Sequence, residues 1–238
     1  MNSLLPKEKK RAETDLNKFK IFLYGSPKIG KSTFASQFDK PLFLATEAGL
    51  TALDAYQIPI TSWEEFQEAC EALQNEEHDF KTVVIDTVDN LAKFCTDYTN
   101  RINGVNHESD LGYGKGYSMA HDRFLKSLTW LSQQNFGLVL VSHENAEIIK
   151  TRTSELTKMV PTLPKGYRKI VLGAIDLILY AHMVERKDPE TEEVEQIRVL
   201  RTKPTENWEA GDRTGRLPEA IRFNFEDFKK AWEESNNG

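Results

Sequence analysis

This sequence has few cysteines, no long apolar run and no excess of positive charge. Its two cysteines, Cys70 and Cys95, lie in segments with helical patterns, which argues against a disulfide framework and predicts a reducing cytoplasm. The longest apolar runs, such as residues 175–180, are too short to span a bilayer, and the charged N-terminus shows no secretory signal. A net charge of −6 argues against a protein that coats nucleic acid uniformly, but it is compatible with a local basic stripe.

Residues 25–32 form a complete G-x-x-x-x-G-K-S phosphate-binding motif. The preceding residues read as a strand and the following ones as a helix, which is the context that this motif requires. The backbone N–H groups of such a loop point at a polyphosphate, Lys31 reaches the β- and γ-phosphates, and the Ser32 hydroxyl ligates Mg²⁺. A glycine-rich turn that merely fits the pattern is the alternative. The motif predicts nucleoside triphosphate binding by Gly25, Ser26, Pro27, Lys28, Ile29, Gly30, Lys31, Ser32 and Thr33.

Short apolar strands alternate with amphipathic helices along most of the chain. We expect strands at 19–24, 41–46, 58–61, 82–86, 137–143, 175–184, 197–202 and 221–225, and helices at 31–38, 63–74, 88–101, 117–134 and 225–234. This alternation predicts an α/β protein with a mostly parallel central sheet and helices on both faces. The crowded late strands predict an antiparallel C-terminal extension. We expect an N-terminal arm at 1–17, one nucleotide-binding domain at 18–225, and a C-terminal helix with an acidic tail at 226–238.

Polar side chains end three further apolar strands. A carboxylate at Asp86 can hold Mg²⁺ next to Ser32, and it can also cap the following helix. Glu47 follows the strand at 41–46, where a carboxylate can orient and deprotonate the attacking water; a solvated loop acid is the alternative. His143 ends another strand, where a polar group can contact the γ-phosphate and sense hydrolysis, although a surface histidine also fits.

The order of these features resembles the RecA-like ATPase core. Asp86 and Thr87 look like that family's Asp-Ser/Thr pair, Glu47 falls where its catalytic glutamate lies, and His143 stands where RecA carries a glutamine. Four features look most like phage-encoded RecA-like recombination ATPases associated with single-strand annealing: the compact length, the Ser-His-Glu strand end, the glycine- and tyrosine-rich residues 112–117 and the Arg-Thr-Lys-Pro segment at 201–204. The resemblance covers residues 18–225 and is weak after residue 144.

The resemblance implies a Mg²⁺-dependent ATPase that acts on single-stranded DNA as a homo-oligomeric ring or filament, with active sites at subunit interfaces. It implies a cytoplasmic protein, in the host cell if phage-encoded, with no membrane contact and with a single-strand-binding protein as a further partner. Loops at 100–116 and 144–169 are placed where RecA-like proteins hold DNA. A RecA-like helicase or helicase-loading motor is one alternative function; a P-loop phosphotransferase and a nucleotide-switched binding module are others.

The second loop has the charge that DNA contact needs. Residues 148–170 contain six basic residues and one acid, a net charge of +5, and Tyr167 could stack on a base. Solvation, or pairing with acids of a neighbouring subunit, is the alternative role for these charges. The candidate nucleic-acid contacts are Lys115, Lys150, Arg152, Lys158, Lys165, Tyr167, Arg168 and Lys169.

Two cations at the end of a late strand are candidates for a catalytic contact between subunits. Arg201 and Lys203 are alternate residues, so we expect their side chains to project together. RecA-like assemblies supply cations to a neighbour's γ-phosphate, and the resemblance implies that role here. Surface salt bridges are the alternative, and Arg213 is a further candidate with less positional support.

Overall fold

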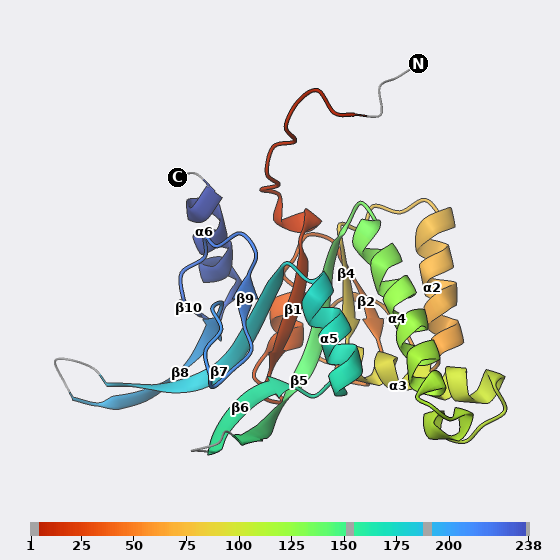
Figure 1. Cartoon of the computed structure of the whole chain (residues 1–238). Helices are drawn as coiled ribbons and strands as arrows, with labels where there is room; N and C mark the ends of the chain where they lie inside the picture. Colours follow the sequence, from red (N-terminus) through yellow and green to blue (C-terminus); the bar gives the residue numbers. More distant parts are fainter. Residues whose placement is uncertain (1–4, 151–154, 188–191, 237–238) are drawn as a thin grey trace.

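A mixed β-sheet of ten strands organises the part of the chain that the structure describes (Figure 1). The structure is a computed structural model and describes residues 5–150, 155–187 and 192–236. Its main path has the strand order β10-β8-β7-β1-β5-β4-β2-β3. The strands are β1 (Lys20–Gly25), β2 (Pro41–Ala45), β3 (Tyr56–Pro59), β4 (Thr82–Asp86), β5 (Gly137–Lys150), β6 (Glu155–Pro161), β7 (Leu177–Lys187), β8 (Val194–Arg201), β9 (Gly211–Asp212) and β10 (Ala220–Arg222).

The sheet has a parallel body and an antiparallel end. Strands β7, β1, β5, β4, β2 and β3 pair in parallel with their neighbours. Strands β8 and β10 continue the sheet beyond β7 in antiparallel pairing. Strand β6 pairs antiparallel with the outer half of β5, and β9 does so with the start of β7. The predicted mostly parallel sheet with an antiparallel C-terminal extension is confirmed.

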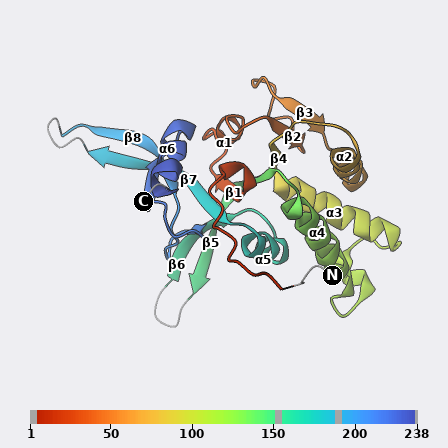
Figure 2. The ribbon, with the colours of Figure 1, turned by 90° about the horizontal axis from the view of Figure 1, so that it is seen from above.

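Helices cover both faces of this sheet (Figure 2). Helices α2, α3, α4 and α5 lie on one face, whereas α1 and α6 lie on the other. None of the helices within the described ranges is long and apolar enough to cross a lipid bilayer. The helices are α1 (Lys31–Ala35), α2 (Trp63–Asn75), α3 (Val88–Ile102), α4 (Lys115–Gln133), α5 (Lys165–Ala174) and α6 (Phe225–Asn236), with short 3₁₀ turns η1 (Leu16–Lys18) and η2 (Glu108–Leu111).

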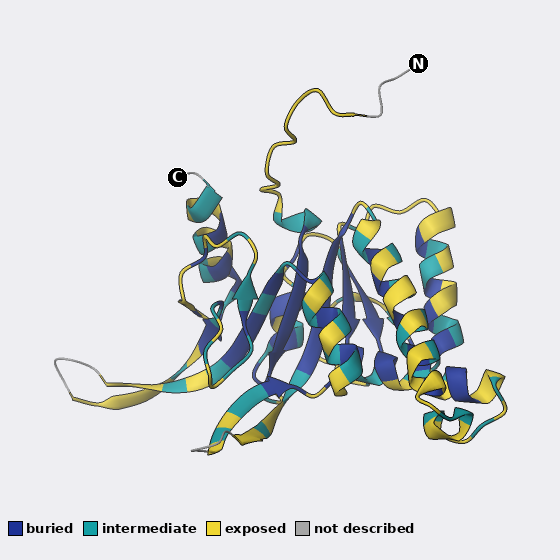
Figure 3. Cartoon of the chain, in the orientation of Figure 1, coloured by how far each residue is buried: buried dark blue, intermediate teal, exposed yellow. Residues whose placement is uncertain are grey.

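Strand β1 contributes to both halves of the core because its side chains alternate between the faces. Phe22 packs in the cluster beneath α2, α3, α4 and α5, whereas Ile21 and Leu23 pack in the cluster beneath α1 and α6. All six residues of β1 are buried. Figure 3 shows this pattern across the sheet: the central strands are buried, and exposed residues gather on the outer helix surfaces and on two hairpins.

The predicted helices and strands all occur, and most of their ends lie within three residues of the expected positions. The expected loop at 144–169 is wrong. Strand β5 continues to Lys150, pairs with β6, and is followed by α5. Prolines mark element boundaries here: Pro161 ends β6, and Pro164 is the N-cap of α5.

The last helix, α6, packs on the residue that precedes β1 and on α1. The rings of Phe19 and Trp232 meet edge to face with centroids 4.5 Å apart, and the Trp232 indole N–H donates to the Thr14 carbonyl oxygen at 2.9 Å. Phe228 is fully buried in the same cluster as Phe34 of α1. Helix α6 therefore completes the core on its face of the sheet, while the predicted division at residue 225 stays a prediction.

We expect Phe228→Ala to lower the free energy of unfolding of the whole domain by about 3–5 kcal/mol, because it leaves a cavity between α6 and α1. Urea denaturation followed by tryptophan fluorescence measures this change. Lys229→Ala, at the exposed neighbouring position, is the control and should change the free energy of unfolding by less than about 0.5 kcal/mol. A wild-type midpoint for Phe228→Ala would mean that α6 is not part of the cooperative core.

Candidate nucleotide-binding site

The phosphate-binding loop leaves the end of β1 under tight steric constraint. A Cβ atom on Gly25 would lie 2.1 Å from the carbonyl oxygen of Ala181 on β7, so the close approach of the two strands requires glycine. Gly30, the N-cap of α1, has a φ of 110°, in a region that side-chain-bearing residues rarely adopt. These two glycines hold the loop in the shape that turns its N–H groups toward one ligand.

Parallel pairing brings the ends of four strands to one edge of the sheet. Gly25 pairs with His143 across β1 and β5, and Asp86 pairs with Ala45 on β2 and with Val141 on β5. This carboxyl edge is where ligands bind in open parallel sheets. A cleft of about 510 Å³ opens there, within the size range of small-molecule sites. Its lining includes Lys28, Gly30, Lys31, Ser32, Thr33, Glu47, Asp86 and His143.

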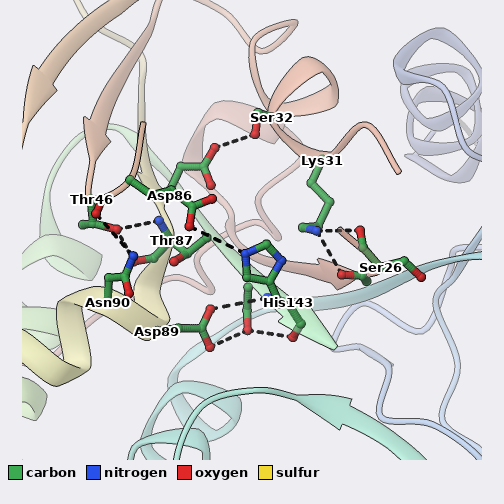
Figure 4. A network of polar contacts seen from close by, with 12 residues as sticks. Ser26, Lys31, Ser32, Thr46, Asp86, Thr87, Asp89, Asn90 and His143 are labelled. Carbon is green, nitrogen blue, oxygen red and sulfur yellow. Dashed lines mark hydrogen bonds and ion pairs between the residues drawn. The ribbon is translucent and has the colours of Figure 1, made fainter. Parts of the chain in front are cut away.

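Lys31 is buried inside the loop. Its ammonium donates to the carbonyl oxygens of Gly25 and Ser26, each at 2.9 Å (Figure 4). Burial lowers the pKa of Lys31, while the carboxylates of Asp86 and Glu144 act in the opposite direction. Phosphate oxygens would offer this ammonium a stronger, charged partner than the two carbonyls.

Ser32 and Asp86 form the second part of the site. The Ser32 hydroxyl donates to Asp86 Oδ2 at 2.6 Å, and Asp86 is almost fully buried. Burial raises the pKa of Asp86, and the hydrogen bond from Ser32 acts against this rise. Mg²⁺ prefers oxygen ligands and commonly takes only one or two from the protein, the rest coming from water and phosphate. A buried carboxylate beside a hydroxyl, next to a phosphate-binding loop, fits that requirement.

Glu47 and His143 face each other across the cleft. His143 Nε2 lies 3.6 Å from Glu47 Oε2, and about a third of each side chain is exposed. The second ring nitrogen of His143, Nδ1, is buried and has no hydrogen-bond partner among the described residues. Glu47, the predicted water-activating acid, and His143, the predicted sensor, are therefore neighbours in the cleft. Their positions in the sequence did not predict this contact.

Hydrogen bonds between side chains and backbone connect the residue after β2 with the residues after β4. The Thr46 hydroxyl donates to the Thr87 carbonyl oxygen at 2.8 Å and accepts from the Thr87 N–H at 2.7 Å. The Asn90 side-chain amide donates to the Thr46 carbonyl oxygen at 3.3 Å. These contacts, drawn in Figure 4, hold Thr46, the residue before Glu47, against Thr87, the residue after Asp86.

Most of the chain matches one known protein family. A family profile described as AAA domain matches residues 17–214, which is most of the chain. This chain belongs to the AAA domain family. The match begins just before β1 and ends after β9, so it spans the parallel sheet and most of the antiparallel extension of this AAA domain.

One curated protein and one solved structure are similar to this AAA domain. The SPbeta prophage-derived uncharacterized protein YorG of Bacillus subtilis (strain 168) is 26% identical over 169 residues, 67% of this chain and 49% of that protein. The chain thus spans about half the length of this relative. The flagellar accessory protein FlaH from Methanocaldococcus jannaschii aligns with a TM-score of 0.45 and 8% identity, covering 87% of this chain and 85% of that chain. The family and the prophage relative confirm the predicted resemblance to P-loop ATPases of phage type.

Two residues that contact the loop of the AAA domain were not predicted. Glu144 contacts the Ser26 hydroxyl through one carboxylate oxygen and accepts from the Tyr180 hydroxyl at 2.8 Å through the other. Arg198 of β8 donates to the Ile29 carbonyl oxygen at 3.0 Å. The sequence could have indicated Glu144, because it directly follows His143, the predicted sensor. The contact of Arg198 depends on how the antiparallel extension packs, and no motif marks it.

The two predicted intersubunit cations have partners within their own chain. Arg201 lies over the Trp208 ring, 5.0 Å from its centroid, and donates to His182 Nε2 at 3.1 Å. Lys203 pairs with Asp212 at 3.1 Å. Neither residue lines the cleft. Their contact with a neighbouring subunit stays a prediction, and it would require these internal contacts to break.

The predicted nucleic-acid contacts divide into buried and exposed residues. Tyr167 is only 4% exposed; its hydroxyl lies 2.6 Å from that of Thr96 and its ring meets Phe124 edge to face, so the predicted base stacking by Tyr167 is wrong. Arg168 pairs with Glu147 at 2.9 Å and is largely covered. Lys158 pairs with Glu209 at 2.8 Å, and Lys150 pairs with Glu155 at 3.0 Å. The side chains of Lys115, Lys165 and Lys169 are exposed. Arg152 lies outside the described residues.

We expect Lys31→Ala to weaken triphosphate binding by about 10- to 100-fold, because it removes one charged hydrogen-bond donor from the loop. Titration with a fluorescent ATP analogue measures the affinity, and a circular-dichroism melt checks the fold. Lys126→Ala, an exposed lysine on α4, should bind with wild-type affinity. Unchanged affinity in Lys31→Ala would contradict the assignment of this loop.

Proposed function

We propose that this AAA domain hydrolyses ATP in a Mg²⁺-dependent reaction. The observation that supports this most strongly is the convergence of three groups on one cleft: the Lys31 ammonium, the Ser32–Asp86 pair and the Glu47–His143 pair. Phosphoryl transfer needs little covalent chemistry from a protein, since positioning and charge stabilisation supply most of the catalysis. In this proposal, each of the three groups either positions a reactant or stabilises charge.

The groups act on different parts of the bound nucleotide. Lys31 exchanges its two carbonyl partners for phosphate oxygens and neutralises part of their charge. Ser32 and Asp86 would hold the Mg²⁺, which supplies further positive charge to the phosphate oxygens when bound. Glu47 orients a water molecule and accepts its proton. His143, within ion-pair distance of Glu47, links that carboxylate to the end of β5.

We further propose that hydrolysis is coupled to single-stranded DNA during recombination or annealing, in a homo-oligomer with sites at subunit interfaces. The proposal is supported by β5, which runs without interruption from the core past His143 into a hairpin with β6 (Figure 1). Ile148 and Ile149 on this hairpin are 64% and 40% exposed, which gives apolar surface for contact with bases. The exposed Lys165 and Lys169 of α5 follow the hairpin directly and would contact DNA phosphates.

For the chemical step, we expect Glu47→Gln to keep ATP affinity within about 2-fold and to slow single-turnover hydrolysis by on the order of 100-fold. The amide keeps the shape of the carboxylate but cannot accept the proton of water. Rapid-quench measurement of the phosphate formed in a single turnover reports the chemical step separately from binding. Glu68→Gln, an exposed acid on α2, serves as the matched control and should hydrolyse ATP at the wild-type rate. Unchanged single-turnover hydrolysis in Glu47→Gln would reduce Glu47 to a loop acid.

For DNA coupling, we expect the double substitution Lys165→Ala/Lys169→Ala to weaken single-stranded DNA binding for all sequences and to leave ATP affinity unchanged. The slope of log affinity against log salt should fall by about 0.7 for each lost phosphate contact. Fluorescence anisotropy over a range of salt concentrations measures both quantities. The control Lys229→Ala/Lys230→Ala removes the same charge from α6, on the other face of the sheet. Equal binding by both variants at every salt concentration would contradict DNA contact at α5.

A further inference from the structure

Asp89, in the first turn of α3, contacts the end of β5 although it lies outside the cleft lining. Its carboxylate accepts from the Ser142 hydroxyl at 2.9 Å and from the His143 backbone N–H at 3.4 Å (Figure 4). Ser142 is fully buried, so the first contact is formed away from bulk water. One donor is Ser142, the last buried residue of β5, and the other is the backbone of the next residue, His143.

The buried surroundings of Asp89 are unfavourable for a charged carboxylate. Burial raises the pKa of Asp89 to about 6, and the hydrogen bonds from Ser142 and from the His143 N–H act against that rise. Because burying an acid costs free energy unless it is hydrogen-bonded, the two donors on β5 offset much of this cost. The arrangement therefore ties the start of α3 to the end of β5.

The ring of His143 lacks the support that usually orients a functional histidine. Such imidazoles are held by a hydrogen bond to the ring nitrogen that does not face the reaction. Here Nε2 faces Glu47 at 3.6 Å, whereas the buried Nδ1 has no hydrogen-bond partner in the part of the chain that the structure describes. Orientation of this ring must then come from packing and from the backbone of His143, which Asp89 holds.

We propose that Asp89 is a positioning residue that clamps the end of β5 and thereby keeps His143 facing Glu47. This inference rests on the proposed hydrolysis of ATP. It also connects the metal-binding and sensing parts of the site, because Asp86 and Asp89 lie on either side of the same junction between β4 and α3. A displacement of that junction would move both the proposed Mg²⁺ ligand and the clamp.

The kinetic test compares Asp89→Ala and Asp89→Asn with the wild-type protein. We expect Asp89→Ala to lower kcat at least about 10-fold by misplacing His143, and to change the ATP dissociation constant less than about 2-fold. The asparagine variant keeps one acceptor oxygen for Ser142 and should recover part of kcat, which also covers the case in which the alanine variant folds poorly. Asp97→Ala, an exposed aspartate on the same helix, should keep the wild-type kcat.

A double-mutant cycle separates the clamp from a general loss of structure. If Asp89 acts through His143, adding Asp89→Ala to His143→Ala should lower kcat no further. A further 10-fold loss in that background, or a wild-type kcat in Asp89→Ala, would overturn the proposal. If Glu47→Gln and His143→Ala lose turnover and Asp89→Ala does not, only the clamp fails. If the wild-type protein itself does not turn over ATP, the proposed hydrolysis fails rather than the clamp.

A spectroscopic readout tests the clamp without any turnover. The imidazole Cε1–Hε1 resonance of His143 is assigned by its loss in His143→Ala. In the wild-type background, Glu47→Gln should shift this resonance, because the two side chains are neighbours. In the Asp89→Ala background, the same change should shift it by less than half as much. An equal shift in both backgrounds would show that Asp89 does not hold the ring toward Glu47.

Discussion

The parallel pairing of β1 with β5 on one side and β7 on the other is the constraint on which the rest of this structure depends. It buries every residue of β1 and brings Gly25 against the Ala181 carbonyl, so the loop has to leave the sheet at that point. The same register sets His143 opposite Gly25. The distance between the phosphate-binding loop and the proposed sensor is therefore set inside the core, by the backbone pairing of β1 with β5.

Several ionisable side chains are buried at or near the carboxyl edge of the sheet, where burial disfavours their charged forms. Asp86 and Asp89 both have pKa values raised by burial, Lys31 has one lowered by burial, and Glu144 adds a further acid beside the loop. Charged groups in such positions are common at functional sites because a ligand supplies the missing partner. A magnesium nucleotide offers both signs, with a cation for the acids and phosphate oxygens for the lysine. Binding would thus relieve unfavourable electrostatics on both sides of the cleft.

Local motifs made part of this site predictable. The spacing of Gly25, Gly30, Lys31 and Ser32 is readable in one short segment, and Asp86 ends an apolar strand that is visible by composition. Contacts between residues from distant segments could not be predicted in this way. The Glu47–His143 pair and the contact of Arg198 with Ile29 depend on strand register and on the packing of the extension. The prediction for Tyr167 was wrong because a basic, proline-containing segment resembles a loop, whereas packing of α5 on α3 and α4 buries that ring.

The uninterrupted course of β5 has a mechanical consequence. From His143 to Lys150 the strand advances by seven residue steps, a length of about 23 Å at about 3.3 Å per step. The inner end of this arm touches the Asp89 carboxylate and faces Glu47, while its outer end forms the hairpin with β6. A tilt of about 10° at the inner end would carry the outer end through about 4 Å on an arm of that length. A small displacement at the candidate nucleotide site would therefore be larger at the outer end of β5, where the strand pairs with β6.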